Sequence, residues 1–339
     1  AGIEYSFNDD LKGEAQIHKY FKDAKGRPVK LKSAIVESKA KDVTLSIDKD
    51  IQASLEEYLK EGVINSKANL GGAAVMDAET GEIWAVANYP SYDPNEVRSS
   101  DRNNIKLSFA TDPFEPGSIL KTLTVASGLK NNIIKPDTNY YCEKGKLKVG
   151  KHYIKESDSD HGHEWLSVSD ILKYSSNVGT TKIAFDITYP TLKKTLNAFG
   201  IGKKTGAEIP GESRGILDES DKVKPIRLSN ISFGQGVATT GLQMLSAYAT
   251  IANGGNYVRP TFLKVTDKKT VKKKRVLSEK TSSTLSEILL SAVNDGTGSN
   301  AKIDHFDIAG KTSTAQRVDG KGGYEGYVSG FIGYPLNVD

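Results

Sequence analysis

Three short polar motifs lie in one order along this 339-residue chain and could together transfer an acyl group. They are Ser118–Lys121, Ser175–Asn177 and Lys311–Thr314. A serine hydroxyl becomes a good nucleophile only when a nearby base takes its proton, and Lys121 can be that base for Ser118. On a helix, residues three apart share one face, with their Cβ atoms about 5–6 Å apart. The pattern predicts a serine enzyme that opens a peptide or lactam carbonyl without a histidine.

The residues around Ser118 favour it over other serines as the nucleophile. The same serine–lysine spacing recurs elsewhere, for example at Ser127 and Ser299, where a solvated surface pair explains it. Ser118 instead follows a Glu-Pro-Gly turn and begins an apolar helical pattern. Backbone N–H groups at a helix N-terminus favour negative charge on a reacting oxygen.

The second motif is the only Ser-x-Asn downstream of Ser118. Ser175–Asn177 falls between two apolar helical stretches, at 168–174 and 178–185. A helix N-cap is the ordinary explanation for such residues. Its place after Ser118 favours a catalytic role instead.

The third motif lies on a predicted strand, residues 305–316, which follows a helix at about 279–293 and a turn at 295–298. Alternate side chains of a strand share a face. Lys311 and Ser313 therefore point one way, and Thr312 and Thr314 the other. The two threonines can hydrogen-bond a substrate carboxylate, while Lys311 adds positive charge beside the Ser175 hydroxyl.

The ordered motifs resemble the set of penicillin-binding proteins and class A β-lactamases. Residues 43–52, 73–92 and 233–236 are also similar to the transpeptidase domain of class B penicillin-binding proteins. The resemblance covers residues 43–336 and is closer to the division-type branch. It implies a peptidoglycan D,D-transpeptidase of septal wall synthesis that β-lactams acylate and that needs no cofactor.

The resemblance also implies roles for individual residues. The backbone N–H groups of Ser118 and Thr314 would hold the oxyanion. The implied catalytic set is Ser118, Lys121, Ser175, Asn177 and Lys311, and the implied substrate-binding set is Thr312, Ser313 and Thr314. One residue departs from the family, which usually has glycine where this chain has Ser313. Strand alternation turns that side chain away from substrate, toward the elements packed behind.

The expected fold is α/β, with a mostly antiparallel five-stranded sheet flanked by helices. Its strands include 73–88, 305–316 and 326–334, and a helical subdomain spans about 118–253. Residues 43–339 are predicted to form the transpeptidase domain. Residues 1–42 resemble the end of an N-terminal pedestal domain and its linker.

Composition sets weaker limits on function. Lysine and arginine exceed aspartate and glutamate by 46 − 42 = 4, too few to argue for nucleic acid as a partner. The basic run at 268–275 is expected to be a solvated hairpin. A single cysteine excludes an intramolecular disulfide, and no apolar run approaches the roughly 20 residues that span a bilayer.

The resemblance places the catalytic domain outside the inner membrane, on its periplasmic or extracytoplasmic side, with this chain as a soluble piece lacking the anchor. It implies peptidoglycan stem peptides and β-lactams as ligands. A glycan polymerase and other division proteins are the implied partners.

Asp158, Asp160, His161 and His163 form the best metal-like cluster in the sequence. A His-Gly-His loop can bind zinc, but no further cysteine or histidine lies close along the chain. A solvated loop beside the substrate is the favoured interpretation, and no metal is predicted.

Other functions remain open at this point. A β-lactamase would use the same nucleophile, but the Glu-x-x-x-Asn setting of class A enzymes does not follow Asn177. A D,D-carboxypeptidase is chemically possible. A non-catalytic division scaffold or antibiotic sensor would predict a broken motif, whereas the serine, both lysines and the asparagine are all present.

Overall fold

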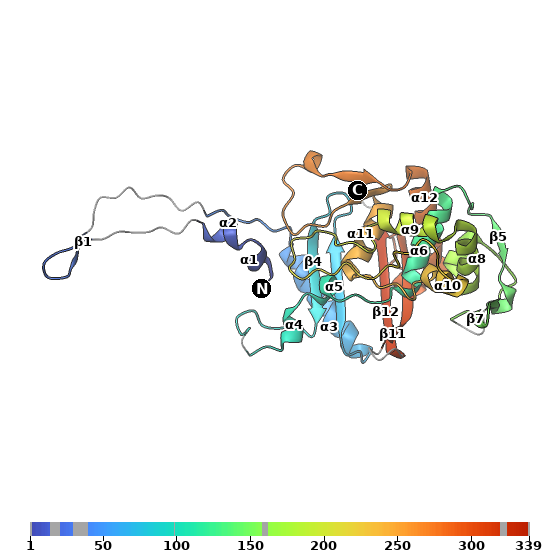
Figure 1. The fold of residues 1–339 in the computed structure, drawn as a ribbon, viewed down its shortest axis with the longest axis horizontal. Coiled ribbons are helices and arrows are strands. Elements are labelled where there is room, and N and C mark those ends of the chain that lie inside the picture. The colour runs from blue at the N-terminus through green and yellow to red at the C-terminus, as the bar shows by residue number, and fades with distance from the viewer. Residues whose placement is uncertain are drawn as a thin grey trace.

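The computed structural model describes residues 2–13, 21–29, 40–97, 99–157, 162–318 and 324–337. Figure 1 shows a body of helices and strands, from which the N-terminal segment extends to one side. Neither helix of this extension has a buried residue. Its elements are α1 (Gly2–Ser6), α2 (Asn8–Lys12), β1 (Phe21–Lys22) and β2 (Pro28–Val29).

A long helix and a hairpin begin the body. Helix α3 (Lys49–Asn65) starts at Asp48, whose carboxylate accepts hydrogen bonds from two first-turn N–H groups. It packs on strands β3 (Gly71–Met76) and β4 (Ile83–Tyr89), which pair antiparallel. Two four-residue helices follow, α4 (Arg102–Ile105) and α5 (Ser108–Thr111).

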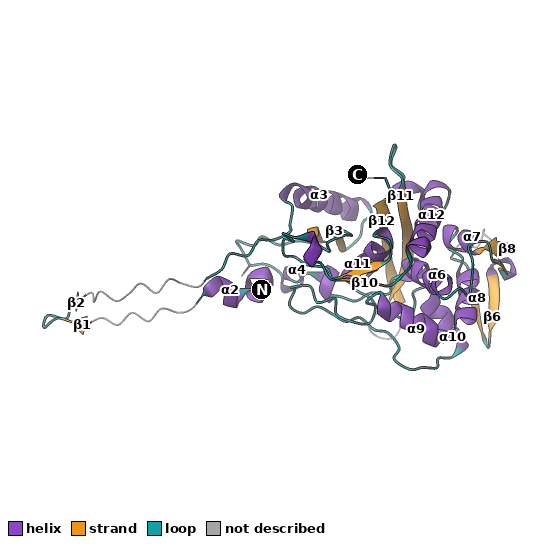
Figure 2. Ribbon diagram, turned by 90° about the horizontal axis from the view of Figure 1, so that it is seen from above, coloured by secondary structure: helices purple, strands orange, loops and turns teal. Residues whose placement is uncertain are grey.

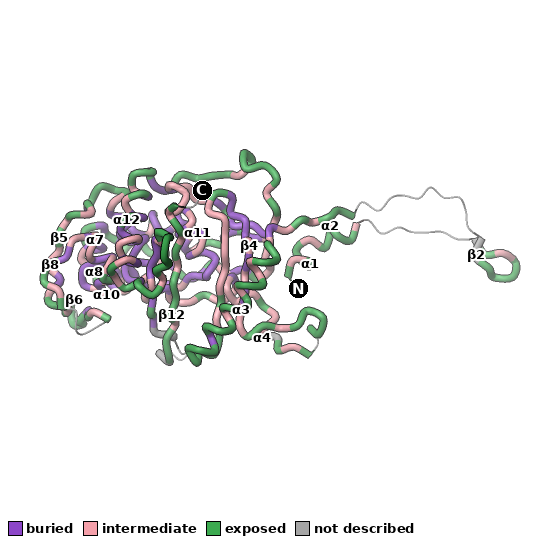
Figure 3. Tube along the Cα trace, turned by 180° about the vertical axis from the view of Figure 1, so that it is seen from behind, coloured by how far each residue is buried: buried purple, intermediate pink, exposed green. Residues whose placement is uncertain are grey.

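Helices predominate between residues 118 and 253, as predicted, and they surround the larger hydrophobic core. Figure 3 shows buried residues gathered near α8, α11 and α12. The 3₁₀ turn and helices of this part are η1 (Gly117–Leu120), α6 (Lys121–Lys130), α7 (Val168–Lys173), α8 (Asn177–Ile187), α9 (Tyr189–Ala198), α10 (Pro225–Ser232) and α11 (Gly241–Ala252).

This part also holds four short strands that the sequence did not predict. They form two antiparallel pairs, and a 3₁₀ turn joins the pairs. The elements are β5 (Asn139–Tyr141) with β8 (Trp165–Ser167), β6 (Lys146–Val149) with β7 (His152–Lys155), and η2 (Glu143–Gly145).

The last part of the chain carries a long helix and a long hairpin, which lie side by side in Figure 2. The ring of Phe331 covers a cross-strand pair of glycines, Gly310 and Gly333. A Cβ added to either glycine would come within 3 Å of that ring. The elements are β9 (Asn256–Val258), η3 (Lys268–Thr270), β10 (Lys273–Arg275), α12 (Glu279–Asp295), η4 (Ser299–Ala301), β11 (Ile308–Val318) and β12 (Tyr324–Pro335).

The prediction of one five-stranded sheet was wrong for the part of the chain that the structure describes. The strands pair only in twos, and no ladder joins β3–β4 to β11–β12. Side-chain packing connects the two hairpins instead, because helix α11 contacts both β3 and β12. The outer edge of β4 is bonded to irregular backbone, for example by the Ile83 N–H to the Thr261 carbonyl at 2.9 Å.

The basic run at 268–275 also differs from the predicted hairpin. It contains η3 and then β10, which pairs with β9 rather than with a strand of the run itself. The three residues of β10 are exposed, so the run is solvated as expected.

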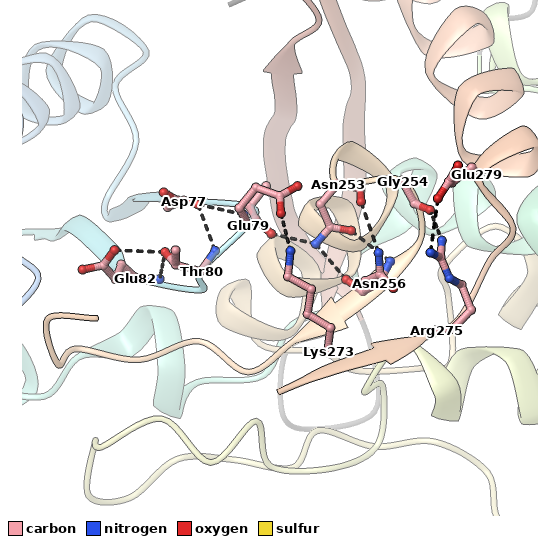
Figure 4. A network of polar contacts seen from close by, with 11 residues as sticks. Asp77, Glu79, Thr80, Glu82, Asn253, Gly254, Asn256, Lys273, Arg275 and Glu279 are labelled. Carbon is pink, nitrogen blue, oxygen red and sulfur yellow. Dashed lines mark hydrogen bonds and ion pairs between the residues drawn. The ribbon is translucent and has the colours of Figure 1, made fainter. Parts of the chain in front are cut away.

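A polar network ties this region to the β3–β4 turn (Figure 4). The Asn253 side chain, at the end of α11, donates to the carbonyls of Ala78 (2.6 Å) and Asn256 (2.8 Å). Lys273 forms an ion pair with Glu79 of the same turn. Three segments distant in sequence are thereby held together.

Two helical glycines give a test of this packing. A Cβ at Gly179 of α8 would lie 2.4 Å from Ile171 Cγ1, whereas a Cβ at Gly62 of α3 would meet nothing within 4 Å. Alanine is favoured over glycine in a helix by roughly 1 kcal/mol, but overpacking costs about 1–3 kcal/mol. We expect Gly62→Ala to raise the melting temperature and Gly179→Ala to lower it. Equal shifts in thermal unfolding would contradict the packing of α8 on α7.

Candidate active site

Ser118 and Lys121 lie on adjoining helical elements. Ser118 belongs to the 3₁₀ turn η1, and Lys121 begins α6. In a 3₁₀ turn, side chains three apart are eclipsed, so the two residues lie on one side of the turn. Ser118 is half-buried, while Lys121 is wholly buried. Ser118 is therefore partly accessible, and the amine is shielded from water.

The lead-in turn, residues 115–117, is held by a glycine-containing loop. Gly117 has a left-handed φ of +56°, and its N–H donates to the Gly234 carbonyl at 3.0 Å. A Cβ at Gly234 would lie 2.1 Å from the Gly117 oxygen, so glycine is needed there. The Gly236 N–H also donates to the Glu115 carboxylate at 2.7 Å. The loop thus fixes the direction from which the chain reaches Ser118.

Ser175 faces Lys121 from the junction between α7 and α8. The Lys121 Nζ donates to the Ser175 carbonyl and lies 3.1 Å from the Ser175 hydroxyl. Ser175 has a φ of +61°, a region that non-glycine residues seldom adopt. This backbone conformation accompanies the presentation of both oxygens to one amine.

Burial determines the charge of the Lys121 amine. Removal from water lowers its pKa well below the usual range, and the positive charge of Lys311 lowers it further, while Glu156 opposes the shift. The shift favours the neutral form of the amine, which a proton acceptor requires.

Lys311 is also buried, on the strand β11. Its Nζ donates to the Thr297 hydroxyl at 3.2 Å and to the Thr312 carbonyl at 3.4 Å. Burial lowers the pKa of Lys311 to about 8. Within the described ranges no hydrogen bond joins Lys311 to Ser175. The positive charge of Lys311 instead lowers the pKa of Lys121.

The side chains of β11 alternate as the sequence predicts. Lys311, Ser313 and Ala315 are buried, whereas Thr312 is half-buried and Thr314 is exposed. The two threonines are therefore available to a ligand. Among the described strands β11 pairs only with β12, so its other edge leaves alternate N–H groups open.

Ser313 packs against the lead-in turn. Its hydroxyl donates to the Pro116 carbonyl at 2.5 Å, and the side chain is 7% exposed. The layer behind the strand at this point is therefore the turn that carries the chain into Ser118. A Cβ at Gly117 would lie 2.7 Å from the Ser313 hydroxyl, so the space between strand and turn is full.

Two polar residues beside these motifs were not predicted. The Thr297 hydroxyl lies between Lys311 and the Thr312 hydroxyl, 3.1 Å from the latter. The sequence showed only a turn there. Glu156 bonds to residues 176 and 177 from about 20 positions upstream, where no local pattern points to that contact.

The Asn177 side chain faces the end of β7. Its amide donates to the Lys155 carbonyl at 2.8 Å and to the Ser157 hydroxyl at 3.4 Å. Asn177 thus starts α8, and the nitrogen of its side-chain amide is bonded to the end of β7.

The metal-like cluster lies largely outside the described residues, because Asp158, Asp160 and His161 are not among them. The ring of His163 stacks on that of Tyr174, with centroids 5.2 Å apart. Within the described ranges no group of three or more candidate ligands could hold a metal ion. Likewise, no helix in those ranges has the length and apolar character needed to cross a bilayer.

Comparison with known proteins gives consistent matches. A family model described as the penicillin binding protein transpeptidase domain matches residues 71–336. The chain is 33% identical to the peptidoglycan D,D-transpeptidase FtsI of Buchnera aphidicola (99% of this chain, 58% of the relative). It is 30% identical to the stage V sporulation protein D of Bacillus subtilis (98% and 54%). The chain thus spans little more than half of these relatives.

A solved structure has the same fold. Penicillin binding protein 3 of Mycobacterium tuberculosis, complexed with aztreonam, superposes with a TM-score of 0.78 at 27% identity. The match covers 97% of this chain and 79% of that one.

The pKa of Lys311 leads to a pH test. If its positive charge helps to hold a ligand carboxylate, acylation by a penicillin should fall as pH rises through about 8, because the ammonium loses its proton there. Lys311→Arg keeps a cation that stays protonated throughout this pH range, so the fall should move to higher pH even if the rate at pH 7 is lower. The measurement is the second-order acylation rate from pH 6 to 10. An unmoved alkaline limb in the arginine variant would contradict this role.

The contact of Ser313 gives a second test. Ser313→Gly removes one buried hydrogen bond, so we expect a loss of about 1 kcal/mol in the free energy of unfolding. Relief of crowding beside the lead-in turn should leave penicillin acylation equal or faster, with little change among dissimilar β-lactams. Ser313→Ala, which keeps the Cβ, is the matched control. A large loss of rate for every β-lactam in both variants would instead show that the hydroxyl is required for catalysis.

Proposed function

Because the chain belongs to the penicillin-binding protein transpeptidase family, we propose that it is a serine-type peptidoglycan D,D-transpeptidase. The main support for this proposal is the buried amine of Lys121, which lies one turn from the half-buried Ser118 and is hydrogen-bonded to Ser175. The pair of a partly open hydroxyl and a shielded, neutral amine is what acyl transfer by serine requires.

In the first step the Ser118 hydroxyl attacks the carbonyl between two D-alanines of a stem peptide. A neutral amine has two N–H donors and one lone pair. Both donors of Lys121 can be used by the carbonyl and hydroxyl oxygens of Ser175, which leaves the lone pair free to accept the Ser118 proton. The backbone N–H groups of Ser118 and Thr314 then stabilise the oxyanion, where one lost donor typically costs roughly 10²–10³ in rate.

Collapse of the tetrahedral intermediate breaks the peptide bond. The proton taken by Lys121 passes through the Ser175 hydroxyl to the nitrogen of the departing D-alanine. The amine of a neighbouring stem peptide next attacks the acyl-enzyme and gives up its proton to Lys121. Lys121 returns that proton to the Ser118 oxygen as the ester bond breaks, which restores the free serine and the neutral lysine. Asn177 orients the donor peptide, while Lys311, Thr312 and Thr314 hold its terminal carboxylate.

The biological setting is part of the same proposal. Stem peptides are the substrates and β-lactams the inhibitors, in line with the aztreonam complex of the mycobacterial relative. Relatives named FtsI favour septal wall synthesis, with a glycan polymerase and other division proteins as partners. Residues 1–42 are then the end of a pedestal, and the catalytic domain works on the outer side of the inner membrane.

The deciding experiment is the intact mass of the protein during incubation with a penicillin. We expect one covalent adduct that persists, because a transpeptidase deacylates slowly without an acceptor amine. Ser118→Ala should abolish the adduct at an unchanged melting temperature, since one hydroxyl is lost, and Ser299→Ala should form it normally.

Other outcomes point to other functions. An adduct that forms and is rapidly lost would indicate a β-lactamase, and release of D-alanine without cross-linking would indicate a D,D-carboxypeptidase. No adduct at all would favour a non-catalytic scaffold. An adduct that survives Ser118→Ala would overturn the choice of nucleophile.

A further inference from the structure

Glu156, at the end of β7, contacts the second motif with both oxygens of its carboxylate. One oxygen accepts the Ser176 hydroxyl at 2.6 Å, and the other accepts the Asn177 N–H at 2.6 Å. The Val178 N–H lies 3.4 Å from the first oxygen. Because Ser176 also caps α8 by accepting the Gly179 N–H at 2.9 Å, the carboxylate completes the start of that helix.

The neighbours of Glu156 contact the same motif. The Asn177 amide donates to the Lys155 carbonyl and lies within reach of the Ser157 hydroxyl. Residues 155–157, which we call the β7 clamp, thus contact residues 176 and 177 through main chain, carboxylate and hydroxyl. The clamp is separated from the motif by about 20 residues, so these contacts form only in the folded chain.

Ser175, which directly precedes the two contacted residues, has a backbone conformation that its surroundings must stabilise. Ser175 has the left-handed φ of +61°, and it faces Lys121 with its carbonyl and hydroxyl. A serine in that region is disfavoured, and such a conformation persists only where the surroundings determine it. Bonds to the two residues that follow Ser175 restrict the backbone in this way.

We propose that Glu156 is a positioning residue for acyl transfer: its carboxylate holds residues 175–177 so that Ser175 presents both oxygens to Lys121. Glu156 touches neither substrate nor nucleophile in this role. The inference rests on the proposed function, since it concerns the rate at which Ser118 is acylated.

The charge of Glu156 adds a second effect in the same place. Two charged groups act on Lys121: Lys311 from β11, which lowers its pKa, and Glu156 from β7, which raises it. Removal of the carboxylate charge would lower the pKa of Lys121 further. The neutral amine would then persist to lower pH, so the acid limb of the acylation profile should move to lower pH.

The experiment compares Glu156→Ala and Glu156→Gln with the wild-type chain, using a fluorescent penicillin from pH 5 to 9. We expect the alanine variant to be acylated at least tenfold more slowly at pH 7, because Ser175 loses its restraint. Glutamine can still accept the Ser176 hydroxyl, so it should recover part of the rate. In both variants the acid limb should lie at lower pH than in the wild type.

Glu143→Gln is the matched control. Its carboxylate also bonds to α8, through Lys182 at 2.7 Å, but no hydrogen bond joins it to residues 175–177 among those described. It should change neither the rate nor the acid limb. Melting temperatures of all variants separate misfolding from mispositioning, and the glutamine variant decides the matter if the alanine variant does not fold.

Several results would overturn the inference. Wild-type rates in both Glu156 variants would show that the carboxylate is not needed for positioning. A lowered melting temperature with an unmoved acid limb and unchanged rates would show a purely structural role. Failure of the wild-type chain to react would instead remove the proposed function, and the inference with it.

Discussion

A lysine amine enclosed by the protein core is the constraint on which this site depends. Charge on a buried amine is costly, so Lys121 is driven toward the neutral form that can accept a proton. Its described hydrogen-bond partners are two oxygens of one residue, Ser175. The second buried lysine lowers the pKa of this amine further, and Ser175, with its left-handed backbone, offers the amine both acceptor oxygens.

The turn that leads into Ser118, the proposed nucleophile, is held by close contacts with two other segments of the chain. The lead-in turn lies between the loop at Gly234 and the strand at Ser313, and both approaches leave no room for larger groups. A serine where the family usually has glycine is accommodated because its hydroxyl finds the Pro116 carbonyl. The substitution therefore adds a direct bond between the third motif and the turn before the first.

The features that depend on residue spacing along a single helix or strand could be predicted from the sequence. The three motifs, the helix near 279–293 and the alternation of β11 were visible because spacing along one element determines them. The pairing of the strands could not be predicted in this way. The described strands form separate pairs instead of one five-stranded sheet, and packing on α11 connects β3–β4 with β11–β12. Glu156 and Thr297 were missed because their contacts join segments distant in the chain, which periodicity does not report.

The aromatic ring of Phe331 over Gly310 and Gly333 limits which mutations this hairpin can accept. This contact fixes the register of β11 against β12 immediately before Lys311. In a strand, a shift of one residue exchanges the two faces. A single residue inserted between Gly310 and Lys311 would then turn the lysine outward and bury the threonines. Single side chains of this strand can therefore be replaced, whereas an added residue between the glycine pair and Lys311 would misplace the whole third motif.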